Sequence, residues 1–126
     1  MILYPIFYFL SIIWFLSHYF RIRLGKNEKM PAPVVCVGNI TLGGAGKTPT
    51  VIFLAQYLNK SNINVHVVSR GYRGKFKDTV LVERRAHSAY EVGDEPLLIS
   101  QYAKVWVSKK KKEGILAAHK AGAELV

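Results

Sequence analysis

The segment Thr41-Leu42-Gly43-Gly44-Ala45-Gly46-Lys47-Thr48 has the residue types of a loop that holds phosphate groups. Glycines let consecutive backbone N–H groups turn toward phosphate oxygens, because no Cβ stands in the way. Lys47 would bring a positive charge to the β- and γ-phosphates, and the Thr48 hydroxyl could ligate Mg²⁺. The usual pattern has glycine at the position of Thr41. A turn that binds nothing is the alternative, but it would leave the entropic cost of three glycines unexplained.

The residues around this loop predict the strand and the helix that such a loop needs. Val34 to Val37 form a short apolar run rich in β-branched residues, which is typical of a strand buried in a parallel sheet. After the loop, Thr50 to Lys60 carries apolar residues at helical spacing, at Val51, Leu54, Ala55 and Leu58. Pro49 is compatible with the first turn of this helix, where an amide has no helical partner.

Strands and helices are expected to alternate along the rest of the chain. The predicted strands are Val65–Ser69, Thr79–Glu83 and Val105–Ser108, and the predicted helices are Glu95–Tyr102 and Lys110–Ala121. This order predicts an α/β fold of the P-loop NTPase type, with a mostly parallel, doubly wound sheet. Ala123 to Val126 resemble the opening of a further strand, which would leave a sheet edge uncovered. We therefore expect the sequence to be the front portion of a longer protein, or a truncated form.

The first twenty residues contain no Lys, Arg, Asp or Glu. As a helix they would extend for about 30 Å, at ~1.5 Å per residue, and basic residues follow at Arg21, Arg23, Lys26 and Lys29. This pattern predicts a membrane-associated helix whose basic end faces the cytoplasm and anionic headgroups. Whether it spans the bilayer or lies in the interface stays open, and packing against protein is the alternative. Pro31-Ala32-Pro33 predicts a linker between residues 1–30 and a nucleotide-binding domain of residues 31–126.

The composition narrows the classes of partner. A formal net charge of +10 calls for an anionic partner, but the basic residues are dispersed and show no nucleic-acid-reading motif, so nucleic acid is not expected. A single cysteine, Cys36, excludes a disulfide within the chain, and its apolar neighbours predict a buried, reduced thiol. His66, His87 and His119 lack the spacing of metal ligands and are expected to be surface or packing residues.

Three motifs together resemble the tetraacyldisaccharide 4′-kinases of the lipid A pathway. They are Val37 to Pro49, which includes the glycine-rich loop, then Ser69-Arg70-Gly71-Tyr72, then Glu91-Val92-Gly93-Asp94-Glu95-Pro96-Leu97-Leu98. The threonine at position 41 is typical of that family. The resemblance covers essentially the whole chain, because the uncharged N-terminal segment with trailing basic residues also fits.

The resemblance implies transfer of the ATP γ-phosphate to the 4′-hydroxyl of a tetraacylated glucosamine disaccharide 1-phosphate. It implies that this lipid is met at the cytoplasmic face of the bacterial inner membrane. By the same resemblance, residues 41–48 bind ATP, and Lys47 and Asp94 are catalytic, with Asp94 assisted by a downstream histidine. Thr48 and Glu95 would lie at Mg²⁺, while Arg70 and Tyr72 would line the site.

Departures from the family and other interpretations remain. Ser108-Lys109-Lys110-Lys111 stands where the family often has Gly-x-x-Arg, and the family's Asp-Asp-Gly-Phe-Gln segment and histidine do not occur in these 126 residues. Loss of activity in this form is therefore one expectation. The alternatives are a membrane-associated P-loop ATPase or GTPase, although no Asn-Lys-x-Asp occurs, and a non-catalytic remnant. Asp94 could also be a helix N-cap, and Lys109 to Lys112 a solvated helix start or a contact for lipid phosphates.

Overall fold

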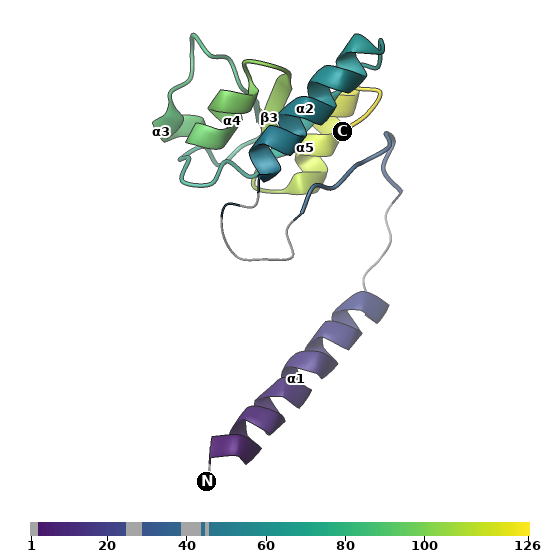
Figure 1. Ribbon diagram of the computed structural model, residues 1–126, viewed down its shortest axis with the longest axis vertical. Helices are drawn as coiled ribbons and strands as arrows, with labels where there is room; N and C mark the ends of the chain where they lie inside the picture. Colours follow the sequence, from purple (N-terminus) through teal and green to yellow (C-terminus); the bar gives the residue numbers. More distant parts are fainter. Residues whose placement is uncertain (1–2, 25–28, 39–43, 45) are drawn as a thin grey trace.

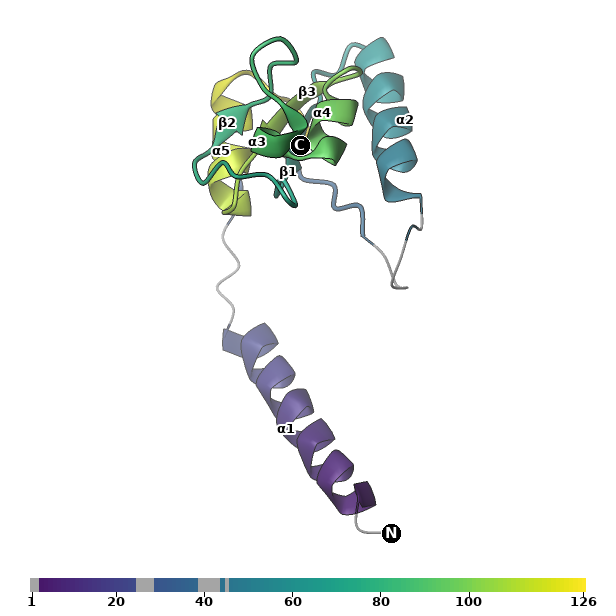
Figure 2. The same ribbon diagram turned by 90° about the vertical axis from the view of Figure 1, so that its left-hand side faces the viewer.

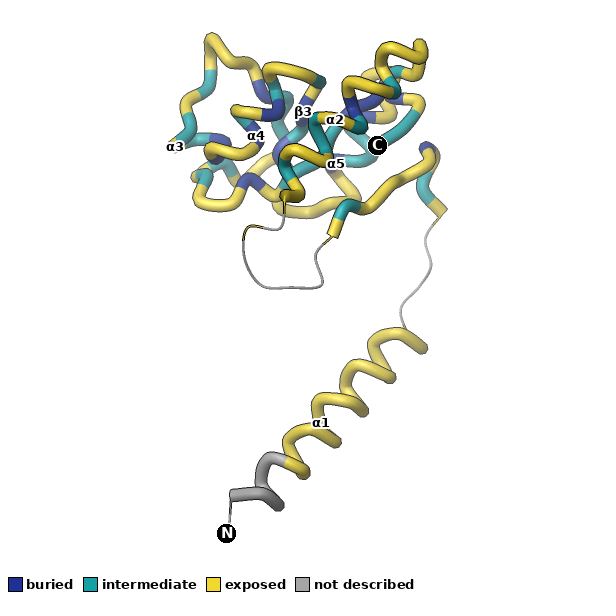
Figure 3. Tube along the Cα trace, in the orientation of Figure 1, coloured by how far each residue is buried: buried dark blue, intermediate teal, exposed yellow. Residues whose placement is uncertain are grey.

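The computed structural model describes residues 3–24, 29–38, 44 and 46–126. Helix α1 (Leu3–Leu24) confirms the predicted N-terminal helix and stands apart from the other elements (Figures 1 and 2). Its residues 8–24 are all exposed (Figure 3). Among the described residues, no helix is both long enough and apolar enough to cross a membrane. Association of α1 with a membrane stays a prediction.

A small mixed sheet forms the centre of the remaining body. Within the described residues its strand order is β1-β3-β2. β1 (His66–Ser69) and β3 (Lys104–Val107) are parallel, and β2 (Val80–Leu81) is antiparallel to β3. A parallel pair needs a long crossover connection, which residues 70–103 with their two short helices provide. Among the described strands, the predicted parallel arrangement therefore holds for the pair β1 and β3 but not for β2.

Helices cover both faces of this sheet. Figure 2 shows α2 (Lys47–Lys60) and α5 (Lys111–Lys120) on opposite sides of the strands. These helices and α4 (Asp94–Ile99) confirm the three predicted helices to within a few residues, while α3 (Ala89–Val92) was not predicted. The core on the α2 and α4 side consists of buried Val82, Val92, Ile99, Val105 and Val107, with Val51, Ile52 and Leu97 packed against it.

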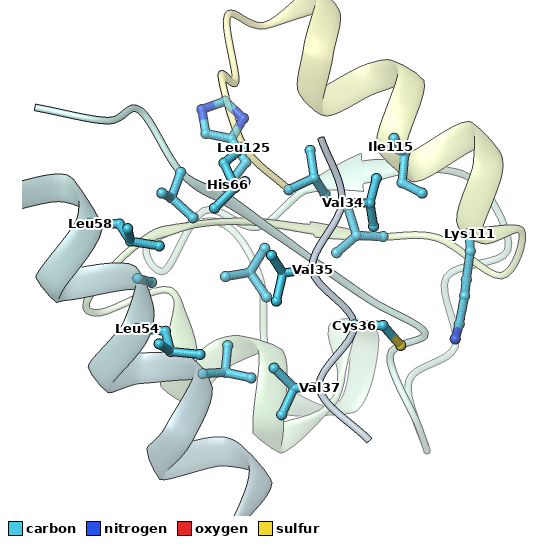
Figure 4. Close-up of a pocket in the computed structure, with 16 residues that line it drawn as sticks. Val34, Val35, Cys36, Val37, Leu54, Leu58, His66, Lys111, Ile115 and Leu125 are labelled. Atoms are coloured by element: carbon cyan, nitrogen blue, oxygen red, sulfur yellow. The ribbon is translucent and has the colours of Figure 1, made fainter. Parts of the chain in front are cut away.

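Residues 34–37 are not a regular strand, and that prediction is wrong. Among the described residues, the backbone hydrogen bonds of residues 33–37 go to Val126 alone: the Val35 amide donates to the Val126 carbonyl at 2.8 Å, and the Val126 amide donates to the Pro33 carbonyl at 3.0 Å. The expected strand at Ala123–Val126 is reduced to one parallel bridge between Val65 and Leu125. A strand needs a neighbour along its whole length, and here an apolar cleft of about 280 Å³ separates residues 34–37 from β1 (Figure 4).

The predicted burial of Cys36 is also wrong. Its side chain is exposed at the edge of this cleft (Figure 4). The apolar neighbours in sequence do not bury it, because their segment lacks a strand partner on the β1 side.

His66 is a packing residue of the β1–α5 side. It is fully buried, and the Trp106 indole N–H donates to its Nδ1 atom at 3.2 Å. Its Nε2 atom has no hydrogen-bond partner among the described residues. Burial, and to a smaller extent the nearby Lys104 ammonium, lowers the pKa of His66 below its ordinary value.

We expect the pKa of His66 to make folding pH-dependent. Below pH ~6.5 the unfolded chain takes up a proton that the folded chain refuses, so the free energy of unfolding should fall as the pH drops from about 6.5 toward the lowered pKa. Urea denaturation at pH 8 and pH 5 would measure this fall. It should be smaller in His66→Phe and unchanged in His119→Gln, whose side chain is exposed. An equal fall in His66→Phe would contradict the assignment.

Candidate nucleotide-binding site

The glycine-rich loop leads directly into α2. Gly46 precedes the helix with φ 72° and ψ 20°, a left-handed conformation that favours glycine, and its carbonyl accepts the Thr50 amide at 3.1 Å. A Cβ atom added at Gly44 or Gly46 would meet no atom of the described residues within 4 Å. The predicted ligands Thr41, Leu42, Gly43 and Ala45 lie outside the described residues.

Lys47 is the first residue of α2, and its side chain is exposed. The amides of a first helical turn lack carbonyl partners within the helix and carry partial positive charge. Lys47 and this turn therefore lie together at one end of a 14-residue helix. Such an end is suited to anionic oxygens, phosphate above all.

Thr48 connects α2 to α4. Its hydroxyl donates a hydrogen bond of 2.5 Å to Oε1 of Glu95, which is 47 residues away in the sequence. Two predicted metal ligands thus lie in contact, one from the first turn of each helix. A hydroxyl and a carboxylate are both oxygen donors of the type that Mg²⁺ prefers. Within the described part of the chain no three His, Cys, Asp or Glu residues cluster, so any ion here would need further oxygens from phosphate or water.

Asp94 is the first residue of α4 and is exposed. The interpretation of Asp94 as a helix N-cap is wrong, because Gly93 occupies that position and no side chain caps the helix. The acidic group therefore does not satisfy the helix end in the way that its sequence position indicated. It lies next to Glu95 in the chain, and hence beside the residue that bonds Thr48.

The loop after β1 carries Arg70 and Tyr72 and packs against the residues that precede Asp94. A Cβ atom at Gly93 would lie 2.7 Å from the Tyr72 carbonyl oxygen, and one at Gly74 would lie 2.7 Å from the Glu91 carbonyl oxygen. Such close backbone approach requires glycine. Arg70 and Tyr72 are both exposed. The backbone of their loop lies against Gly93, at the start of α4.

Sequence reasoning missed the role of Lys109. Its ammonium donates to three backbone carbonyls of the same loop, Arg70 at 3.3 Å, Gly71 at 3.2 Å and Gly74 at 3.3 Å. No motif could have signalled this, since carbonyl acceptors belong to every residue type. The neighbouring Lys110 pairs with Glu113 at 2.9 Å on the helix surface.

The capping box that begins α3 was also missed, and here a signal existed. Ser88 and Glu91 bond each other's backbone in the Ser-x-x-Glu pattern. These bonds hold the short helix that leads to Gly93, and they lower the pKa of the Glu91 carboxyl, chiefly through the Ser88 amide.

The apolar cleft of Figure 4 is separate from this polar constellation. Its lining comes from residues 34–37, α2, residues 65–68, α5 and residues 125–126, and it includes no Asp or Glu side chain. Its lining supplies one cation, Lys111, and no side-chain hydroxyl or carboxylate. The first turns of α2 and α4 instead bring Lys47 together with Thr48 and Glu95, so these two turns are the candidate site.

Comparisons with known proteins point to one family, the family that the motifs of this site resemble. A family model described as tetraacyldisaccharide-1-P 4′-kinase matches residues 1–126. A tetraacyldisaccharide 4′-kinase from Dinoroseobacter shibae is 51% identical over 106 residues, which cover 84% of this chain and 32% of the relative. One from Jannaschia sp. is 47% identical over 104 residues, covering 82% and 32%. The chain thus spans about a third of the length of the curated relatives that it matches.

A solved structure is similar as well. It is LpxK from Aquifex aeolicus in its "apo" form in complex with ATP, with a TM-score of 0.75 and 34% sequence identity. The similarity covers 91% of this chain and 38% of that chain.

Proposed function

Because this chain belongs to the tetraacyldisaccharide-1-P 4′-kinase family, we propose that it supplies the ATP-binding part of a lipid A 4′-kinase. The reaction is transfer of the ATP γ-phosphate to the 4′-hydroxyl of a tetraacyldisaccharide 1-phosphate. The observation that carries the proposal is the contact of Thr48 with Glu95 at the end of α2 that also presents Lys47. Phosphoryl transfer depends on positioning and charge stabilisation, which such an arrangement can supply.

Each residue then has a role in the transfer. Lys47 and the first-turn amides of α2 hold the β- and γ-phosphate oxygens and stabilise the charge that develops on them. The 4′-hydroxyl oxygen forms a bond to the γ-phosphorus while the bond from that phosphorus to the bridging oxygen breaks, which releases ADP. Asp94 accepts the proton of the attacking hydroxyl. Arg70 and Tyr72 bind the acceptor beside it.

Thr48 and Glu95 are the residues that would hold Mg²⁺. When bound, the ion would neutralise charge on the phosphate oxygens. The fit rests on their two oxygen atoms, which already share one hydrogen bond.

Replacing Glu95 with glutamine should therefore raise the Mg²⁺ concentration needed for half-maximal ATP binding roughly tenfold, equivalent to about 1.4 kcal/mol. Binding of ATP in EDTA should not change. Titration calorimetry at several Mg²⁺ concentrations measures this shift. Glu113→Gln, which removes only the surface pair with Lys110, is the matched control. Equal Mg²⁺ dependence in Glu95→Gln and the unaltered chain would count against the metal role.

The same proposal locates the protein at the cytoplasmic face of the bacterial inner membrane, with α1 bound to anionic lipids. Its support is the exposed apolar surface of α1, including Trp14 and Phe15, beside Arg21 and Arg23 in the last turn. We expect the chain to sediment with vesicles that contain anionic lipid. Trp14→Ser combined with Phe15→Ser should reduce the bound fraction severalfold, whereas Phe53→Ser, at another exposed aromatic on α2, should not. Equal loss in both proteins would contradict this.

The proposal is tested with γ-labelled ATP and a tetraacyldisaccharide 1-phosphate in mixed micelles. Label in the lipid supports the kinase. Phosphate release without labelled lipid would favour the membrane-associated ATPase, and absence of any Mg·ATP-dependent rise in thermal stability would favour the non-catalytic remnant. ATP binding without transfer would limit these 126 residues to the nucleotide-binding role.

A further inference from the structure

Two exposed tyrosine rings, each with a cation over its face, lie on neighbouring segments close to the start of α4. Tyr72 is 79% exposed and Tyr90 is 64% exposed. The Arg73 guanidinium carbon is 5.6 Å from the centre of the Tyr72 ring, and the Lys75 ammonium is 4.1 Å from the centre of the Tyr90 ring. We call these four residues the tyrosine–cation surface. Ring faces attract cations, so each pair holds a charge beside a flat apolar surface.

The backbone beneath this surface is fixed at several points. The Gly74 amide donates to the Gly71 carbonyl at 2.9 Å and closes a turn, in which Arg73 adopts a positive φ of 65°. A left-handed conformation is costly for arginine and persists only where surrounding contacts impose it, which is common at ligand sites. The Lys75 amide donates to the Tyr90 carbonyl at 3.2 Å, so the two segments are joined directly.

This surface adjoins the proposed catalytic residue. The Tyr72 carbonyl lies against Gly93, the residue before Asp94, at a distance that excludes any side chain. The three hydrogen bonds from Lys109 hold the other side of the same turn. A molecule resting on the Tyr72 ring would therefore contact the loop whose backbone packs against the residue before Asp94.

The charges on this surface favour an anion. The nearest carboxylate along α3, Glu91, is already occupied by the Ser88 amide and hydroxyl, both at 2.8 Å. Among the described residues, neither Lys75 nor Arg73 forms an ion pair with a carboxylate. The C–H face of a pyranose ring matches a tyrosine ring face. Such a surface is suited to a molecule that carries both a phosphate and a sugar ring.

The geometry assigns to the tyrosine–cation surface the binding of the phosphorylated glucosamine headgroup of the acceptor lipid. Tyr90 packs against a sugar ring, and Lys75 pairs with a phosphate. This assignment rests on the proposed function, since it concerns the acceptor of that reaction. It adds Lys75 and Tyr90 to the residues that meet the acceptor.

The test measures binding of a soluble probe, glucosamine 1-phosphate, to the full 126-residue chain by NMR titration. Tyr90→Ala and Lys75→Met should each raise the Kd for the probe at least fivefold. Tyr90→Phe should keep the Kd of the unaltered chain, because the ring remains. Tyr102→Ala removes a tyrosine that is 43% exposed near the end of α4 and should have no effect. Inorganic phosphate should bind more weakly than the probe and should be insensitive to Tyr90→Ala.

An unchanged Kd in Tyr90→Ala would overturn the assignment, as would equal affinity for phosphate and the probe, or equal loss in Tyr102→Ala. Circular dichroism of each variant identifies any loss of fold, and Tyr90→Phe gives a second result that does not depend on Tyr90→Ala folding. Mg·ATP is titrated separately. If Mg·ATP failed to bind while the probe still bound, the proposed kinase would be refuted but the sugar-phosphate site would not. If Mg·ATP bound while the probe did not, the sugar-phosphate site would be refuted but the proposed kinase would not.

Discussion

Replacing Lys47 with alanine is expected to weaken Mg·ATP binding by about two orders of magnitude and to leave the fold intact. Hydrogen bonds from a charged donor contribute about 1.5–3 kcal/mol each, and Lys47 would make them to two phosphates at once. The helix should not suffer, because Lys47 is exposed and alanine is the best helix former. Calorimetric titration of Mg·ATP measures the loss, and circular dichroism reports the fold.

Lys60→Ala is the matched control for this experiment. Lys60 ends the same helix at its opposite end and is also exposed, so its removal changes the net charge equally without touching the phosphate end. It should leave the Kd within about twofold, as expected of a distant surface charge screened by salt. If Lys47→Ala bound Mg·ATP as well as Lys60→Ala did, the phosphate role of this loop would be refuted, and with it the proposed function.

What could be predicted from the sequence depended on how local the signal was. α2 follows from the spacing of Val51, Leu54 and Leu58, because helix packing repeats along one segment. The run Val34–Val37 has high β propensity, yet it is not a strand. A strand depends on a neighbouring strand, and the residues of the segment itself do not specify that neighbour. The same reason explains why the antiparallel direction of β2 could not be read from its residues.

In the candidate site, too, local features could be predicted and contacts between distant residues could not. The lysine and glycine pattern before α2 indicated phosphate chemistry because each residue type has its own purpose there. The contact of Thr48 with Glu95 joins residues 47 positions apart, and only the family resemblance pointed to it. Lys109 escaped notice altogether, since its partners are backbone carbonyls of a distant turn. A hydrogen bond to a backbone carbonyl leaves no trace in the identity of the residue that accepts it, whereas a close backbone approach leaves one only by requiring glycine.

One such contact makes Gly93 a residue at which the free energy of unfolding should be highly sensitive to substitution. Gly93 has φ 95° and ψ 152°, a region that is essentially restricted to glycine. An added Cβ would also lie 2.7 Å from the Tyr72 carbonyl oxygen, which is backbone and cannot rotate away. We expect Gly93→Ala to lower the free energy of unfolding by about 3–5 kcal/mol, within the range of the most damaging single substitutions. Urea denaturation followed by circular dichroism measures the change.

Two other glycines separate the causes of this loss. Gly122 has a similar φ of 90°, but an added Cβ would meet only Asn64 Nδ2 at 3.7 Å, so Gly122→Ala reports the backbone strain alone, about 1–3 kcal/mol. Gly38→Ala meets nothing within 4 Å and should be nearly neutral. The excess of Gly93→Ala over Gly122→Ala measures how tightly the Tyr72 loop is held against the start of α4. Equal losses at both positions would mean that this packing is not what holds Asp94 beside the acceptor surface.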